Sequence, residues 1–205
     1  MKRSLSLAGV LTLSALAVPS PATAAVFTPG YSFSGGFATA SDTNITIGFA
    51  FYLPSETISV TQLGFFDFNS DGLSAGREVG LWNDAGTLLS STAVPTGTAA
   101  PLIGGFRYAP ITPVTLLPEQ RYWLGGRPLG EVYFNQVSQA PAPQLLVVDA
   151  GGTHFANGPT LTYPRGSFSS GSSAVSNFLF VVVPEPTSAA LLGITSLALL
   201  RRRNR

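Results

Sequence analysis

Short runs of alternating apolar and polar positions fill the middle of the chain. In 47–53, isoleucine, phenylalanine or leucine stands at every second position, with glycine, alanine and tyrosine between them. A period of two is that of a β-strand with one buried face. Pro54, which has no backbone N–H to donate, ends the run. The pattern predicts a strand that packs one face against a core.

A second alternating run predicts another strand with an irregularity inside it. Its apolar positions are Ile58, Val60, Leu63 and Phe65. The parity of these positions changes after Val60, as it does where one residue is inserted into a strand. We therefore expect a β-bulge near Gln62.

Turn residues separate the next two runs. Asn83-Asp84-Ala85-Gly86 lies between apolar positions at 79–81 and 88–93, and Asn, Asp and Gly suit a tight turn. The stretch predicts a β-hairpin. Later apolar runs predict further short strands at 106–108, 114–116, 122–124, 132–137, 145–148 and 178–183.

These runs predict one all-β domain over 25–183. Pro110 and Pro113 separate two of the predicted strands, and 26–46 predicts a loose first hairpin or arm. We find no convincing apolar stripe at helical spacing. Short strands with frequent turns are typical of a single antiparallel β-sandwich, here expected to be jelly-roll-like.

The first residues have the pattern of a secretory signal peptide. Lys2 and Arg3 precede an apolar run over 5–18, and Ala22-Thr23-Ala24 supplies the small residues at which signal peptidase cleaves. We therefore expect 1–24 to be removed, the mature chain to begin near Ala25 and the protein to be exported.

The last residues combine a rigid break, an apolar segment and a basic end. The break is Pro184, Glu185 and Pro186, and the segment 189–200 carries no charge. Arg201, Arg202, Arg203 and Arg205 follow nearby. The positive-inside tendency places such a C-terminus in the cytoplasm.

The apolar segment is short for a membrane helix. Residues 187–200 as a helix would reach roughly 21 Å, less than the hydrocarbon core of about 30 Å. Arginine snorkelling and local thinning of the bilayer would have to make up the difference. The alternative is an ordinary buried helix.

This order of segments resembles the PEP-CTERM sorting signal of Gram-negative bacterial surface proteins. The resemblance covers 184–205 and implies a membrane-embedded exosortase as partner, which recognises Pro184, Glu185 and Pro186 while the helix and Arg201, Arg202 and Arg203 hold the chain. It implies an inner-membrane-anchored precursor. Cleavage near the motif would then place the body at the cell surface or outside the cell.

The composition of the body excludes several classes of function. The formal charge of +1 comes from the two ends, whereas 25–183 holds five arginines, no lysine and nine carboxylates, a net charge of −4. Such a body gives no support for nucleic-acid binding. The chain has no cysteine, so it has no disulfides, thiolate nucleophile or Cys-based metal site.

Part of the body also resembles a β-sandwich domain of undefined function found in other PEP-CTERM proteins. The resemblance covers roughly 45–130 and rests on four short motifs. These are Asp71-Gly72-Leu73, Glu78-Val79-Gly80-Leu81-Trp82, Gly86-Thr87-Leu88-Leu89 and Phe106-Arg107-Tyr108. It implies a fold and no activity.

One loop has the spacing of a calcium site. Asp67, Asn69, Asp71 and Glu78, with Gly72 among them, satisfy the pattern D-x-[DN]-x-[DN]-G-x5-E. Calcium takes six to eight oxygen ligands, which alternating carboxylate and amide side chains can supply. The flanking runs predict strands, so we infer no EF-hand fold. The alternative is a polar turn whose Asp and Asn side chains bond their own backbone.

Other candidate chemistry is weaker. His154 is the single histidine and lies in a glycine-rich stretch, where we expect an exposed loop residue. Glu119 and Glu131 are the carboxylates of a glycosidase hypothesis, which needs them close in space. Four aromatic residues would stack sugars if exposed, and otherwise pack in the core: Trp82, Trp123, Tyr122 and Tyr133.

Two functions of different classes follow from these observations. The first is a non-enzymatic, exported surface or extracellular-matrix protein with extracellular polysaccharide as its candidate ligand. The second is a secreted carbohydrate-active enzyme on a jelly-roll scaffold. The first is favoured. An enzyme should show convergent polar side chains in a concave site, so a structure with only smooth sheet faces would count against the second.

Overall fold

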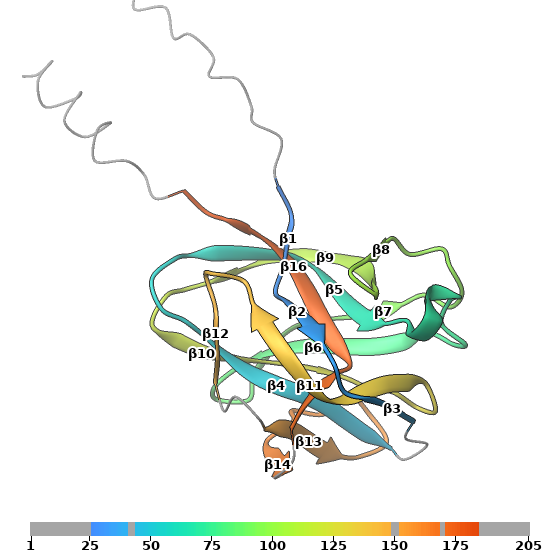
Figure 1. The fold of residues 1–205 in the computed structure, drawn as a ribbon. Coiled ribbons are helices and arrows are strands. Elements are labelled where there is room, and N and C mark those ends of the chain that lie inside the picture. Colours follow the sequence, from blue (N-terminus) through green and yellow to red (C-terminus); the bar gives the residue numbers. More distant parts are fainter. Residues whose placement is uncertain (1–25, 41–43, 149–151, 169–170, 185–205) are drawn as a thin grey trace, which may run out of the picture.

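The fold is all-β, with every pairing between its strands antiparallel (Figure 1). The computed structural model describes residues 26–40, 44–148, 152–168 and 171–184, and it holds no α-helix among them. The predicted signal peptide and the tail beyond Pro184 lie outside the described residues. Three sheets account for all the strands.

The five-stranded sheet has β5 at its centre. Its order is β1 (Thr28–Pro29), β16 (Ser176–Val182), β5 (Ile58–Phe66), β9 (Phe106–Leu116) and β8 (Leu102–Ile103). The bulge predicted near Gln62 is confirmed, because the register of β5 shifts between Val60 and Gln62 against β9, and at the same place against β16. The first and last described strands, β1 and β16, are neighbours, so both ends of the described chain leave the domain side by side (Figure 1).

The seven-stranded sheet has β4 and β10 at its centre. Its order is β14 (Gly166–Phe168), β13 (Thr153–Asn157), β4 (Ile45–Leu53), β10 (Gln120–Gly126), β6 (Arg77–Asn83) and β7 (Leu88–Val94), with β12 (Leu146–Val148) paired to the far end of β4. The strand expected at 47–53 and the hairpin around Asn83 to Gly86 are both confirmed. The hairpin turn is closed by hydrogen bonds between Asn83 and Thr87.

A third, four-stranded sheet covers one side of the core. Its long strand, β11 (Val132–Pro141), pairs with β15 (Ser172–Ala174), β2 (Tyr31–Ser34) and β3 (Phe37–Ala40). Residues 26–40 are thus an arm and not a hairpin, because β2 and β3 pair with β11 instead of with each other. The range predicted for the arm, 26–46, extends into β4, which begins at Ile45.

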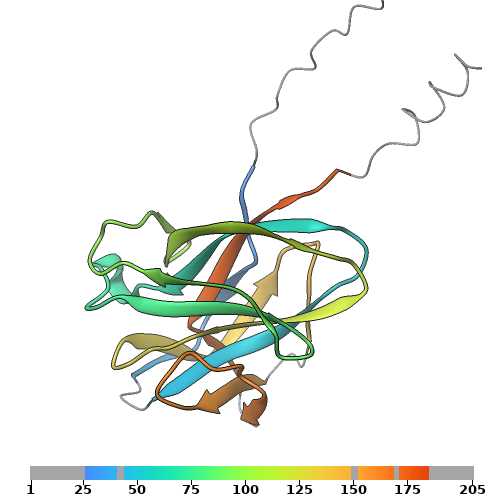
Figure 2. The same ribbon diagram turned by 180° about the vertical axis from the view of Figure 1, so that it is seen from behind.

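The core lies between the sheets (Figures 1 and 2). Phe49, Phe51 and Leu53 of β4 are buried, and Phe51 stacks on Phe178 of β16 with ring centroids 5.0 Å apart. The alternate positions of β4 face the other side of the sheet, where Ala50, Trp82 and Trp123 form a separate cluster under Leu161 and Tyr163. Two antiparallel sheets that share such a core are consistent with a β-sandwich.

One prediction of strand boundaries is wrong. The runs at 106–108 and 114–116 belong to one strand, β9, and the prolines between them do not end it. Val60 of β5 pairs with Val114 of β9, and Gln62 pairs with Pro110. One residue of β5 therefore lies opposite three residues of β9, which are Ile111, Thr112 and Pro113. Proline has no N–H to donate, so it is tolerated at bulges and sheet edges, where no partner strand needs that hydrogen bond.

Candidate functional site: the loop between β5 and β6

The residues of the calcium pattern fall into two groups in the structure. Asp67, Asn69 and Asp71 lie in the loop that follows β5, around the short 3₁₀ helix η1 (Phe68–Ser70), whereas Glu78 lies in β6. The carboxylate of Asp67 is buried, while Asn69 and Asp71 are exposed. The carboxylate of Asp67 therefore points into the domain, whereas the side chains of Asn69 and Asp71 lie in solvent.

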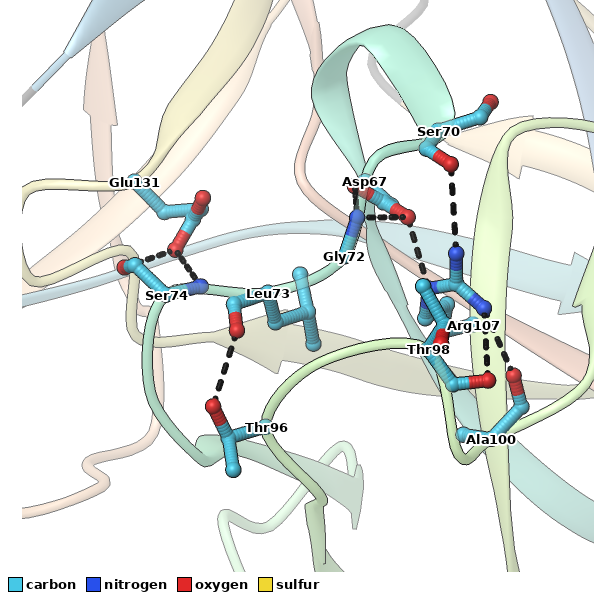
Figure 3. A network of polar contacts seen from close by, with 10 residues as sticks. All are labelled: Asp67, Ser70, Gly72, Leu73, Ser74, Thr96, Thr98, Ala100, Arg107 and Glu131. Atoms are coloured by element: carbon cyan, nitrogen blue, oxygen red, sulfur yellow. Dashed lines mark hydrogen bonds and ion pairs between the residues drawn. The ribbon is translucent and has the colours of Figure 1, made fainter.

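Asp67 is bound by the loop itself and by β9 (Figure 3). The backbone N–H of Gly72 donates to both of its carboxylate oxygens, at 3.1 Å each. Nε of Arg107 donates to Oδ2 at 2.6 Å, and both charged side chains are almost completely buried. Buried ion pairs are tolerated when further hydrogen bonds satisfy their remaining donors and acceptors.

Arg107 provides those further bonds and joins two loops (Figure 3). Its Nη1 donates to the carbonyls of Thr98 and Ala100, at 3.2 and 2.9 Å, and its Nη2 donates to the carbonyl of Ser70 at 3.3 Å. A planar guanidinium suits this role because its donors point in fixed directions. The side chain holds the 67–72 loop and the 98–100 segment against the start of β9.

Gly72 makes the close approach of these two loops possible. Its φ is +109°, and a Cβ there would lie 3.0 Å from Cα of Gly97. Leu73 and Gly97 exchange backbone hydrogen bonds across the gap. The glycine of the predicted calcium pattern therefore serves loop packing, which is the ordinary use of glycine at positive φ.

Two further arginines hold carboxylates nearby. Arg77 donates to Oε2 of Glu131 through Nε and Nη2, at 3.1 and 2.6 Å, and the hydroxyl of Ser74 donates to the same oxygen at 2.6 Å. Arg127 donates to Glu78 at 2.7 Å. Asp67 and Glu78 are therefore each paired with a different arginine, Asp67 with Arg107 and Glu78 with Arg127.

The pKa of Glu131 reflects these contacts. Partial burial raises it, but hydrogen bonds from Ser74 and Arg77, together with the charge of Arg77, outweigh burial and bring the pKa below its usual value of 4.5. A carboxyl whose folded pKa is depressed stabilises the fold above the unfolded pKa, and the contribution is lost as the pH falls through the folded pKa.

We expect Glu131→Gln to be less stable than the wild type at neutral pH, with a difference that shrinks as the pH falls through the lowered pKa of the folded Glu131 carboxyl. Urea unfolding at a series of pH values measures this difference. Glu56→Gln, at an exposed turn position, is the control and should match the wild type throughout. A difference for Glu131→Gln that stays constant over the whole range would contradict the assignment.

The geometry of the loop favours the polar-turn interpretation over the calcium interpretation. Among the described residues there is no group of three or more His, Cys, Asp or Glu side chains placed to hold a metal ion. Calcium would have to displace Arg107 from Asp67 and Arg127 from Glu78, because cation and guanidinium compete for the same oxygens. The calcium site remains a prediction of the sequence.

We expect the melting temperature of the wild type to be unchanged by several millimolar calcium. A site filled at tenfold excess over its dissociation constant would add about 1.4 kcal/mol, which amounts to a few degrees in a domain of this size. Thermal unfolding with and without calcium separates the two cases. A rise of that size, abolished by Asp71→Ala, would establish the calcium site instead.

The aromatic residues considered for sugar stacking are all buried. Trp82, Trp123, Tyr122 and Tyr133 are at most 6% exposed, so the core-packing alternative is confirmed for them. Nε1 of Trp123 donates to Asp84 at 2.9 Å. The rings therefore present no open stacking platform.

His154 is not the exposed loop residue that the sequence suggested. It lies in β13, is 5% exposed and packs edge-on against Trp123, with ring centroids 4.7 Å apart. The sequence around His154 did not predict a strand, because β13 is stabilised by its pairing with β4 and not by its own composition.

The two glycosidase carboxylates lie at opposite ends of one strand. Glu119 directly precedes β10 and Glu131 follows it, beyond Gly126. A seven-residue strand spans roughly 24 Å at about 3.4 Å per residue, whereas paired glycosidase carboxyls are about 5 to 10 Å apart. The structure does not bring this pair together.

A cavity of about 320 Å³ lies between the five-stranded and the four-stranded sheets. It is lined mainly by apolar groups of β1, β2, the β8–β9 turn and the end of β11, including Tyr31, Ile103 and Pro141. The amide of Asn177 and the hydroxyl of Tyr31 are buried polar groups of its lining, and both are already hydrogen-bonded. The Asn177 amide bonds the backbone of Tyr31 and Phe178, and the Tyr31 hydroxyl donates to the carbonyl of Ser176. The cavity thus lacks the free convergent polar groups typical of an active site.

The arginines are the residues that sequence reasoning missed. The body holds five arginines and no lysine, and that preference is the available signal, since arginine is the residue of choice for buried pairs. Arg77, Arg107 and Arg127 are each at most 6% exposed and each binds a carboxylate.

The sorting residues lie almost wholly outside the described part of the chain. Of the motif, Pro184 is described, and it is exposed just beyond β16; Glu185, Pro186, Arg201, Arg202 and Arg203 are not described. Within the described residues, no helix has the length and apolar character needed to cross a bilayer.

Comparison with known proteins adds no relative. No family model, no curated protein and no solved structure matches the chain.

Proposed function

We propose that the chain is an exported, non-enzymatic bacterial surface or extracellular-matrix protein, sorted through a C-terminal PEP-CTERM signal. The observation that carries the proposal is the order of segments after β16: Pro184-Glu185-Pro186, an uncharged apolar run over 189–200, and Arg201, Arg202 and Arg203. An exosortase and a signal peptidase are the processing partners that this order implies.

The end of β16 supports access to the motif. Val182 is the last residue of the strand, the N–H of Val183 donates to the carbonyl of Thr57 at 2.9 Å, and Pro184 is exposed. Within the part of the chain that the structure describes, the motif therefore begins one residue after the last backbone hydrogen bond to the domain. A protease can reach a segment that is not paired in a sheet.

We also infer a jelly-roll-like β-sandwich for the body. Supporting this are the two facing antiparallel sheets with one shared core, and strands that follow each other in sequence but often lie in different sheets, as β4 and β5 do. In this proposal the fold is a rigid unit for display, and extracellular polysaccharide is its candidate ligand.

Intact-mass analysis of the cell fractions tests the proposal. We expect the mature chain to begin near Ala25 and to end between Pro184 and Thr187. In a strain that lacks its exosortase, the tail should persist and the protein should stay in the inner membrane. Soluble extracellular protein that still ends at Arg205 would refute the proposal.

Glu185→Ala tests the motif separately from the fold. We expect this variant to accumulate in the membrane fraction with its tail uncut, because the recognition element is altered. Its melting temperature should equal that of the wild type, since β16 ends at Val182. Glu56→Ala is the control for a lost surface carboxylate and should be sorted normally. A large loss of stability in Glu185→Ala would instead make the motif part of the fold.

A further inference from the structure

Exposed apolar side chains gather at the end of the domain from which both chain ends leave. Val26, Phe27, Leu117, Val182 and Val183 are each between 36% and 78% exposed. Together they are five of the nine large apolar side chains that are exposed among the described residues. We call these five residues the exit rim.

Strand pairing brings the members of the exit rim together. Val182 of β16 pairs with Ile58 of β5, and Ile58 pairs with Leu116 of β9. Leu117, the next residue after Leu116, therefore lies two strands across the sheet from Val182. Neighbouring strands are about 4.8 Å apart, which sets this separation at roughly 10 Å. On the other side of β16, Thr28 of β1 pairs with Phe180, and Phe27 precedes it (Figure 1).

The sequence on both sides of the exit rim is apolar. Residues 184–188 alone separate Val183 from the run at 189–200, and five residues reach at most about 17 Å. The apolar run of the signal segment, 5–18, precedes Val26 by a similarly short stretch. Any bilayer that holds the tail therefore lies close to this end of the domain.

We propose that the exit rim contacts the surface of the lipid bilayer while the tail anchors the precursor, an inference that rests on the proposed membrane tail. Apolar side chains at the headgroup boundary are removed from water without crossing the membrane. Exposed apolar patches of this kind mark interaction sites. The contact orients the domain so that Pro184 lies at the membrane surface, within reach of a membrane-embedded enzyme.

Two carboxylates limit the kind of lipid. Glu56 and Glu119 are exposed in the turns that border the exit rim. Negative side chains are repelled by anionic headgroups. The proposed partner is accordingly a zwitterionic lipid surface, contacted through apolar side chains.

The chain has no cysteine, so single labels can be placed freely. The full chain is exported in a bacterium without an exosortase, which leaves the tail in place, and is reconstituted into phosphatidylcholine vesicles. Leu117→Cys and Val182→Cys carry an environment-sensitive fluorophore at the exit rim. Phe37→Cys is the matched control, since Phe37 and Leu117 are 51% and 50% exposed but Phe37 pairs with Asn135, at the far end of β11 from Pro141 and the cavity beside β1. Ala189→Cys reports on the tail.

Nitroxide-labelled lipids are the quencher. We expect loss of fluorescence at Leu117, Val182 and Ala189, and no loss at Phe37. If Ala189 is quenched but Leu117 and Val182 are not, like Phe37, the membrane contact is overturned and the proposed sorting function still stands. No loss at Ala189 would overturn both, because the tail would then not be in the bilayer. Unfolding curves of each labelled variant verify that the domain is intact.

Discussion

Replacing Arg107 with alanine should cost the domain about 3 to 5 kcal/mol of unfolding free energy, the usual result of removing one partner of a buried ion pair. Asp67 is 1% exposed and would lose the guanidinium that now lies 2.6 Å away. The carbonyls of Thr98, Ala100 and Ser70 would lose a donor at the same time. Urea unfolding at neutral pH measures the loss.

An exposed ion pair of the seven-stranded sheet is the control for Arg107→Ala. Arg121 and Asp84 are 3.9 Å apart, with side chains 38% and 58% exposed. Exposed pairs contribute about 0 to 1 kcal/mol, so Arg121→Ala should change stability by no more than that. Equal losses in the two variants would mean that Arg107 is not a centre of the fold.

A second variant separates charge from packing at the same place. Asp67→Asn keeps the shape of the side chain, so Gly72 can still donate to its carbonyl oxygen, but the charge opposite Arg107 is gone. We expect it to destabilise, since Arg107 would be the uncompensated buried charge. Asp67→Asn with wild-type stability would show that the loop needs the hydrogen bonds and not the ion pair.

The strands that the sequence predicted best are those whose signal is local. The alternation in β4, the change of parity in β5 and the Asn83 to Gly86 turn each report on a few consecutive residues, and each is confirmed. β4 and β5 also carry large, fully buried side chains, Phe51 and Phe65 among them. The alternation located β4 because every second residue of a strand shares one face. The prediction that only one face of β4 is buried is wrong, since Ala50 on the other face is buried as well.

The strands that were missed are defined by their partners. β13, β14 and β15 are three to five residues long, and β15 reads Ser-Ser-Ala, with no apolar alternation. β15 is nonetheless buried, because it pairs with β11. Its composition could not reveal this, since propensity for strands depends on neighbours across the sheet.

The candidate site shows the same limit for chemistry. The pattern of Asp67, Asn69, Asp71 and Glu78 is local and readable, but the partner that decides the state of Asp67 is Arg107, forty residues away. No spacing rule connects them. The loop sequence shows which side chains have oxygen atoms that could bind calcium. The tertiary contacts show that the carboxylates of Asp67 and Glu78 already bind arginines.

Gly48 is the position in the central sheet where an added methyl group should be least tolerated. It lies in the middle of β4, between β10 and β13, with Gly125 opposite on one side and His154 on the other. An ideal Cβ at Gly48 would overlap the backbone carbonyl oxygen of Leu124. A backbone atom in a paired strand cannot move aside as the end of a flexible side chain can.

Gly48→Ala should therefore destabilise the domain by about 1 to 3 kcal/mol or more, as overpacked cores do. The matched control is Gly76→Ala, where a Cβ would meet only the carbonyl oxygen of Val94, at 3.6 Å, which is ordinary contact. That variant should equal the wild type or exceed it by about 0.4 to 1 kcal/mol, because alanine restricts the unfolded chain. Urea unfolding of both variants under one condition makes the comparison. Equal stability of Gly48→Ala and Gly76→Ala would mean that β4 and β10 are not held as closely at this point as the pairing of Gly48 with Gly125 requires.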